Sequence, residues 1–176
     1  MKNILLLILL LYFLILFQTG FLNFLKTVPN FVLITILTLA IFQKRENFNL
    51  IPLLFGGFFL DIFSGLPFSV ATLSLVLVYF LSLFLLRIFL KINFFEVAVI
   101  FILSSLLYKF LIPSFNYLFG LISQNLQPWQ FNFTYLTLIE IILNLVLGII
   151  VFGLIKKYGL QPTHHPSKRQ LQPASR

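Results

Sequence analysis

Six long runs of apolar residues most limit how this chain can fold. They cover residues 4–25, 28–42, 50–63, 68–86, 95–119 and 135–155. A helix needs about 20 apolar residues to cross the hydrocarbon core of a bilayer. Of the 176 residues 60% are hydrophobic, and a soluble domain of this size has too little interior to bury them. The sequence therefore predicts an all-α integral membrane protein, a bundle of about six transmembrane helices.

The basic residues predict the orientation of this bundle. With six spans both termini lie on one side, which collects ten of the 12 Lys and Arg residues: Lys2, Lys44, Arg45, Arg87, Lys91, Lys156, Lys157, Lys168, Arg169 and Arg176. The opposite side has Lys26, and Lys109 falls inside the fifth span. Lys and Arg concentrate in cytoplasmic loops. We therefore expect both termini in the cytoplasm, and the net charge of +8 needs no nucleic-acid partner to explain it.

The chain divides into a membrane domain and a tail. Residues 1–158 are predicted to form one polytopic helical domain, because tight loops separate the spans. The first run is interpreted as a retained helix, since it lacks the small residues of a signal-peptide cleavage site. Residues 159–176 are polar and rich in Pro and Gln, which predicts a disordered, basic cytoplasmic tail.

One predicted span contains a carboxylate, Asp61, close to its outer end. On a helix Gly57, Asp61 and Ser64 recur at i, i+4 and i+7 and share a narrow face, which Gly65 continues. Small residues on such a face allow another helix to approach closely. Gly65 predicts the helix end, and Pro67 is expected in the first turn of the next helix. The result is a tight hairpin on the outer side.

Asp61 needs a compensating partner, because the dipole at the C-terminal end of a helix disfavours an anion. The sequence leaves three candidates: a cation, backbone amides of the hairpin, or a proton. It also leaves open whether the small face packs within this bundle or docks a partner helix. The internal role is preferred.

Two further ionisable residues fall inside predicted spans, Lys109 in the fifth and Glu140 in the sixth. Lys109 lies ten residues below the outer end of its span, or about 15 Å at the helical rise per residue. Unpaired charges at this depth are costly. We therefore expect Lys109 to form an ion pair with Glu140 or with Asp61, rather than to extend unpaired to the interface.

Catalytic and metal-binding groups are scarce. Catalysis within a membrane needs a nucleophile with a base, a carboxylate pair or a metal site. The chain has no Cys, and its two His residues, His164 and His165, are adjacent in the tail, without a third ligand. Asp61 and Glu140 lie in no known catalytic motif. We therefore expect no enzyme activity, no metal and no cofactor.

The run GFFLDIFSGLP at residues 57–67 resembles the signature of the rod shape-determining protein MreD family. Members have about this length, lack large soluble domains and carry an aspartate before a Ser-Gly-x-Pro turn. Gln18, at the end of the Leu-rich first helix, and Pro29, at the start of the second, are also similar. The likeness in span count and loop placement covers about residues 1–158.

Two positions depart from the family pattern. Members often carry glycine two residues after the turn proline, where this chain has Ser69. They often carry an acidic residue after the proline that opens the second span, where this chain has Asn30.

The resemblance implies a non-catalytic scaffold of the cell-elongation machinery in the bacterial inner membrane. It implies association with the bitopic protein MreC and, through it, with the MreB filament and the peptidoglycan synthases of lateral wall growth. The family is regarded as similar in fold to the substrate-binding subunits of energy-coupling-factor vitamin transporters. Besides these proteins we expect contact with membrane lipid and with no small-molecule substrate.

A vitamin-transporter substrate-binding subunit is the alternative, since it shares size and span count. Such subunits usually carry small residues along the first helix, whereas residues 4–17 contain no Gly, Ala or Ser. The outer loop near Trp129 would have to hold the ligand. Gene neighbourhood distinguishes the two: genes for an actin-like protein and a single-span coiled-coil protein favour the scaffold, and ATPase genes favour the transporter.

Overall fold

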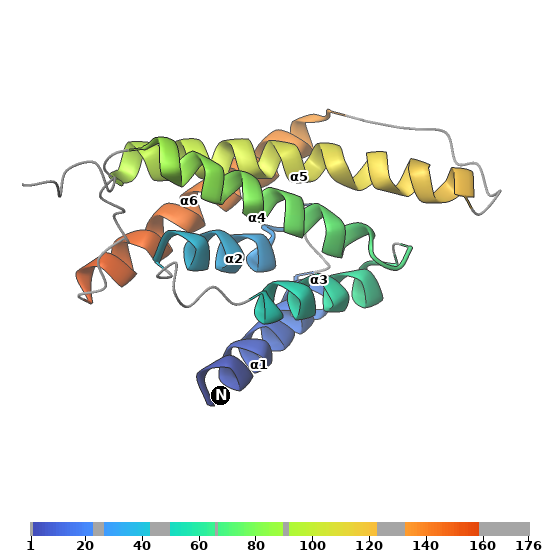
Figure 1. Ribbon diagram of the computed structural model, residues 1–176, viewed down its shortest axis with the longest axis horizontal. Helices are drawn as coiled ribbons and strands as arrows, with labels where there is room; N and C mark the ends of the chain where they lie inside the picture. Colours follow the sequence, from blue (N-terminus) through green and yellow to red (C-terminus); the bar gives the residue numbers. More distant parts are fainter. Residues whose placement is uncertain are drawn as a thin grey trace, which may run out of the picture.

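The computed structural model describes residues 2–22, 27–42, 50–65, 67–89, 92–122 and 133–158, and every regular element in these ranges is helical. The elements are α1 (Lys2–Leu16), the π-helical turn η1 (Phe17–Phe21), α2 (Phe31–Phe42), α3 (Ile51–Ser64), α4 (Val70–Ile88), α5 (Phe94–Ile122) and α6 (Tyr135–Lys157), as Figure 1 shows. The all-α architecture is confirmed for this part of the chain. The predicted tail, residues 159–176, lies outside the described residues.

Helix length separates two groups of elements. Helices α4, α5 and α6 are long and apolar enough to cross a membrane. Helices α2 and α3 have 12 and 14 residues, or about 18 and 21 Å at 1.5 Å per residue, which is short of a 30 Å hydrocarbon core. Helix α1 continues into η1 without a break, from Lys2 to Phe21. A helical membrane protein is therefore supported, while the count of six spans stays a prediction.

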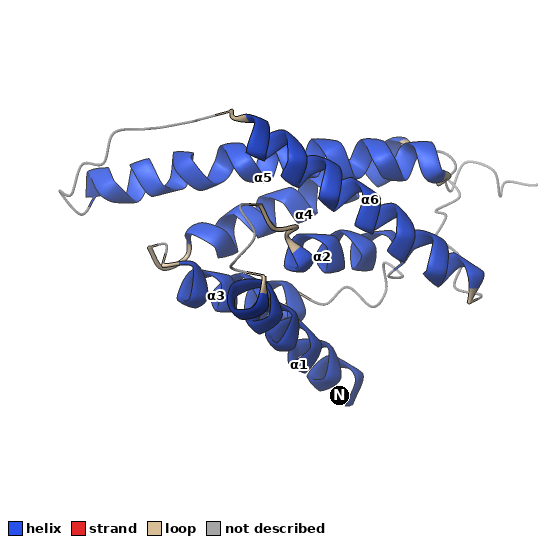
Figure 2. Ribbon diagram, turned by 180° about the vertical axis from the view of Figure 1, so that it is seen from behind, coloured by secondary structure: helices blue, strands red, loops and turns tan. Residues whose placement is uncertain are grey.

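Helix α2 lies at the centre of the bundle. It contacts each of the other five α-helices, and Figures 1 and 2 show it between α5 and the α1–α3 pair. Eight of its 12 residues are buried. A helix that is apolar all round is a buried helix, and the sequence FVLITILTLAIF meets that condition.

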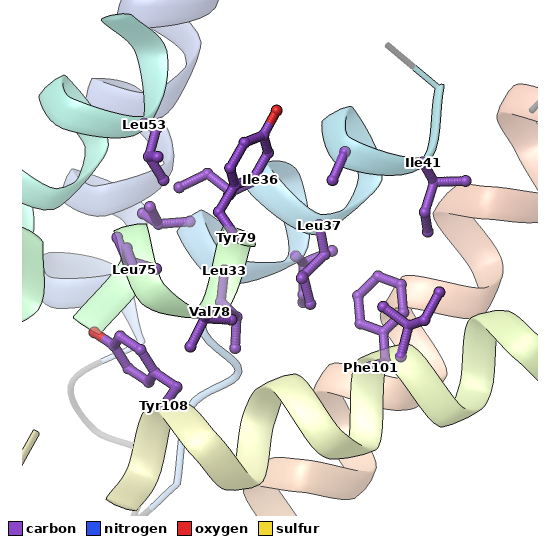
Figure 3. Close-up of a cluster of buried hydrophobic side chains, with 14 of the residues drawn as sticks. Leu33, Ile36, Leu37, Ile41, Leu53, Leu75, Val78, Tyr79, Phe101 and Tyr108 are labelled. Carbon is purple, nitrogen blue, oxygen red and sulfur yellow. The ribbon is translucent and has the colours of Figure 1, made fainter. Parts of the chain in front are cut away.

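The apolar core surrounds α2. Leu33 and Leu37 of α2 are fully buried against Leu75 and Val78 of α4 and against Phe101 of α5, the cluster drawn in Figure 3. Because α2 is enclosed by protein, it does not have to span the whole bilayer.

Glycines set the closest approaches between helices. A Cβ at Gly57 would lie 2.5 Å from the Thr72 Cα, so the backbones of α3 and α4 nearly touch there. A Cβ at Gly148 would lie 2.4 Å from the Phe101 ring, so α6 receives a phenylalanine of α5 at that point. Small residues in membrane helices commonly serve this purpose.

Candidate functional site

The hairpin between α3 and α4 depends on two residues with left-handed backbone. Gly65 ends α3 with φ 67°, a conformation that glycine adopts without a Cβ penalty. Ser69 precedes α4 with φ 78°, and among the described non-glycine residues it alone has a positive φ. The Val70 N–H donates to the Pro67 carbonyl at 3.2 Å. Together these features direct the amides at the start of α4 back toward α3.

Asp61 accepts those amides. Oδ1 accepts the Ala71 N–H at 2.6 Å, and Oδ2 accepts the N–H groups of Ser69 at 3.0 Å and Thr72 at 3.3 Å. Oδ2 also accepts the Thr72 hydroxyl at 2.6 Å. The Asp61 side chain is 3% exposed. The sequence left open three kinds of partner for Asp61, and in the structure its partners are the backbone amides of the hairpin.

The position of Asp61 resolves an electrostatic conflict. The carboxylate lies three residues before the C-terminal end of its own helix, where the dipole disfavours a negative charge. It binds at the N-terminus of α4, where unpaired N–H groups and the dipole both favour one. One side chain thus satisfies the orphan amides of the second helix and joins it to the first.

The remaining motif residues have different environments. Gly57 is buried at the α3–α4 contact, as the small face predicted. Ser64 is exposed, so the packed face ends at Asp61, because the chain turns away at Gly65. The placement of Pro67 in the first turn of α4 was wrong: α4 begins at Val70, and Pro67 lies in the preceding turn.

Lys109 and Glu140 are paired. The Lys109 Nζ lies 2.5 Å from the Glu140 Oε2, and the two side chains are 34% and 16% exposed. Of the two partners that the sequence left open for Lys109, the structure has Glu140. The pair joins α5 to α6, which are neighbouring helices (Figure 2).

A buried amide network lies beside this ion pair. Asn30 accepts the Leu33 N–H at 3.0 Å and so caps α2, and its own N–H donates to the Asn144 Oδ1 at 2.7 Å. The Asn144 Nδ2 donates to the Ser105 Oγ at 3.4 Å. Three helices, α2, α5 and α6, are held at one level by these contacts.

Gln18 adds a further contact to the start of α2. Its Oε1 accepts the Phe31 N–H at 3.2 Å. Gln18 lies in the π-helical turn, which changes the direction of side chains relative to a regular α-helix. The amides of Asn30 and Phe31 are therefore satisfied by side chains from two other elements, α6 and η1.

The sequence reasoning missed this network. It counted ionisable residues inside spans and passed over Asn144, although a carboxamide in a hydrocarbon environment also needs partners. Asn144 between apolar residues of the sixth run was the signal that could have found it. The partner could not have been found, because Asn30 and Asn144 are 114 residues apart.

The site is suited to holding helices together. The Asp61 oxygens receive four hydrogen bonds, and Glu140 is engaged by a lysine. The one side-chain hydroxyl that Asp61 contacts among the described residues, the Thr72 hydroxyl, donates to it beside three backbone amides. The chemistry that these groups perform in the fold is hydrogen bonding and charge pairing.

Comparisons of this chain with protein-family models, with curated proteins and with solved structures find no match. No family is therefore assigned to the chain. What it does is inferred from the hairpin, the paired charges and the motif at residues 57–67.

Proposed function

We propose that this protein is a non-catalytic membrane scaffold of the bacterial cell-elongation machinery, of the MreD type. In this role it associates with an MreC-like bitopic protein in the inner membrane. Through that protein it contributes to positioning the MreB filament and the lateral-wall peptidoglycan synthases. Both chain termini lie in the cytoplasm in this proposal.

The observation that carries the proposal is that hydrogen bonds from the start of α4 engage both carboxylate oxygens of Asp61. Asp61, the one ionisable residue of the motif, is 3% exposed and accepts four hydrogen bonds from the start of α4. An aspartate in that state stabilises a hairpin. This supports a structural role for the Asp-x-x-Ser-Gly-x-Pro motif, as a scaffold requires.

The two departures from the family pattern, Ser69 and Asn30, are compatible with the backbone of this chain. Ser69 has φ 78°, in the region that glycine adopts most easily, and glycine is the residue that family members often carry there. Asn30 caps α2, and an acidic residue at that position would cap the helix equally well. Both replacements therefore fit the local backbone of this chain.

Depletion of the protein in a rod-shaped host tests the proposal. We expect rods to become round and newly made peptidoglycan to lose its lateral pattern, because the synthases are no longer positioned. Fluorescent labelling of new wall material in growing cells measures both effects. A plasmid copy of the wild-type gene should restore rods.

The same strain distinguishes the alternative function. Normal cell shape together with a requirement for an added vitamin would contradict the scaffold and favour the transporter subunit. Affinity purification of the tagged protein from detergent-solubilised membranes gives a second measurement. We expect a single-span coiled-coil protein among the retained proteins, and recovery of an ATPase module instead would also contradict the proposal.

A further inference from the structure

The ion pair of Lys109 and Glu140 lies at the edge of the bundle. The buried residues of α5 form one stripe: Val97, Ile100, Phe101, Ser104, Ser105 and Tyr108. Lys109 follows the last of them and is rotated by about 100° from it. With 34% of the Lys109 side chain exposed, the pair is open to the lateral surface of a single copy.

Such exposure is unfavourable inside a bilayer. Lys109 lies 13 residues before the end of α5, or about 20 Å along its axis. Charged side chains within spans almost always face the interior of a bundle or a water-filled cavity. The short distance to Glu140 also shows that the lysine turns toward its partner rather than toward an interface.

The backbone adds another polar group at this level. Pro113 lies inside α5 and has no N–H, so the Lys109 carbonyl cannot receive the usual hydrogen bond from residue 113. The residue that carries the ammonium therefore also has a carbonyl without its helical hydrogen bond. Lipid chains satisfy none of these groups, whereas a second protein surface can.

We propose that the α5–α6 face around Lys109 and Glu140 is a contact surface between two copies of this chain in the membrane. Glu140 and Lys109 come from neighbouring helices and touch, so their charges lie at nearly the same depth. Two copies with the same orientation are related by a two-fold axis along the membrane normal. That rotation reverses the order of the charges, which sets each ammonium opposite the carboxylate of the other copy.

The charge order therefore makes the face self-complementary. A partner without charges at this depth would leave the pair as poorly solvated as lipid does. The exposed neighbours of the pair on α5 and α6 are apolar, among them Phe110, next to Lys109, and Ile139, next to Glu140. They tolerate lipid and protein alike, so the four-charge cluster provides the specificity of the contact.

Cysteine cross-linking tests the contact directly, because the chain has no cysteine of its own. Leu143→Cys lies one turn after Glu140 on the same side of α6. Leu77→Cys on α4 is the matched control. Leu77 is 45% exposed. The contact between Ser82 and Ser104 sets the register of the antiparallel helices α4 and α5. Because Leu77 is five residues before Ser82 and Lys109 is five residues after Ser104, Leu77 and Lys109 lie at about the same depth.

The purified variants are reconstituted in vesicles of phosphatidylethanolamine and phosphatidylglycerol and treated with a thiol cross-linker. We expect a dimer with Leu143→Cys at several times the yield obtained with Leu77→Cys. Equal yields, or no dimer with either variant, would overturn the proposal. Since the vesicles contain no other protein, the outcome does not depend on the proposed role in cell elongation.

A charge exchange gives the second test. The variant Lys109→Glu with Glu140→Lys keeps the internal ion pair and the self-complementary order. A mixed dimer with the wild type would place lysine against lysine and glutamate against glutamate. Two differently tagged copies are expressed in one membrane, one copy is purified through its tag, and the amount of the other copy that is retained with it is measured. We expect several-fold less of the second copy when a wild-type copy is combined with the exchanged variant than when both copies are the same form. Equal retention of the mixed combination would contradict the contact surface.

Discussion

Asp61 and the start of α4 depend on each other. The carboxylate has no cation within the described contacts, and three backbone amides and one hydroxyl take that place. Without the carboxylate, the buried Ala71 amide and the half-buried Ser69 and Thr72 amides would lose this acceptor. An unsatisfied buried group costs about 1–3 kcal/mol, so the hairpin and the side chain are coupled energetically.

Replacement of Asp61 by asparagine is expected to destabilise the protein. The asparagine side chain would keep one acceptor oxygen, but its NH2 group would face the N–H donors of α4. The free energy of unfolding should fall by about 1–3 kcal/mol, which thermal unfolding of the purified protein in detergent measures. Ser64→Ala is the control and should lie within about 0.5 kcal/mol of the wild type, as exposed substitutions do. An Asp61→Asn variant as stable as the wild type would contradict the cap.

Ser69→Gly is expected to stabilise the protein. A non-glycine residue in left-handed backbone costs about 1–2 kcal/mol, and glycine removes that strain while losing part of the gain to chain entropy. We expect a net increase of up to about 1 kcal/mol in the free energy of unfolding. Ser69→Ala keeps the Cβ and should be close to the wild type. A loss of stability with Ser69→Gly would contradict the role of the strained backbone.

The sequence predicted the identity of the key residues better than their partners. Asp61, Lys109 and Glu140 were recognised because charges inside apolar runs are unusual. The partner of Asp61 could not be chosen, since it depends on the positive φ of Ser69, which nothing in a serine predicts. The partner of Lys109 depends on which helices are neighbours, and that information is not local.

At the scale of helices, apolar runs predicted all six segments, but not their ends. The second run was expected over residues 28–42, and α2 begins at Phe31, because Asn30 caps it. The first was expected to reach residue 25; α1 becomes π-helical at Phe17 and this turn ends at Phe21, while residues 23–25 lie outside the described residues. The start of α2 is thus set by a capping side chain, which a count of apolar residues does not register.

Gly57→Ala is expected to separate α3 from α4. Its Cβ would lie 2.5 Å from the backbone Thr72 Cα, and a backbone atom cannot rotate away. The strain should lower the free energy of unfolding by about 1–3 kcal/mol, again measured by thermal unfolding in detergent.

Gly153→Ala is the matched control for that substitution. A Cβ at Gly153 would have its nearest neighbour, the Phe94 ring, at 3.8 Å, and alanine favours the helix by about 1 kcal/mol over glycine. The variant should therefore be neutral or more stable than the wild type. If both variants lost stability equally, the close α3–α4 contact would not be the cause.

At the scale of the whole molecule, the two ends of the bundle differ in charge. Arg87 lies in the last turn of α4, and Lys156 and Lys157 lie in the last turn of α6. The Lys156 Nζ lies 5.5 Å from the centre of the Phe94 ring at the start of α5. The C-terminal end of α6 therefore lies beside the N-terminal end of α5. The hairpin at Gly65 and Ser69 lies at the other end of α4. Such asymmetry orients a membrane protein.

Single cysteines at the two ends test this orientation. Tyr158 is 82% exposed beside the basic end, and Phe68 is 64% exposed in the hairpin, so either position accepts a thiol reagent. In spheroplasts a membrane-impermeant maleimide should label Phe68→Cys at once and Tyr158→Cys only after the membrane is permeabilised. The reason is that lysines and arginines are retained in the cytoplasm during insertion. The reverse pattern would place the termini outside and contradict the proposed orientation toward a cytoplasmic filament.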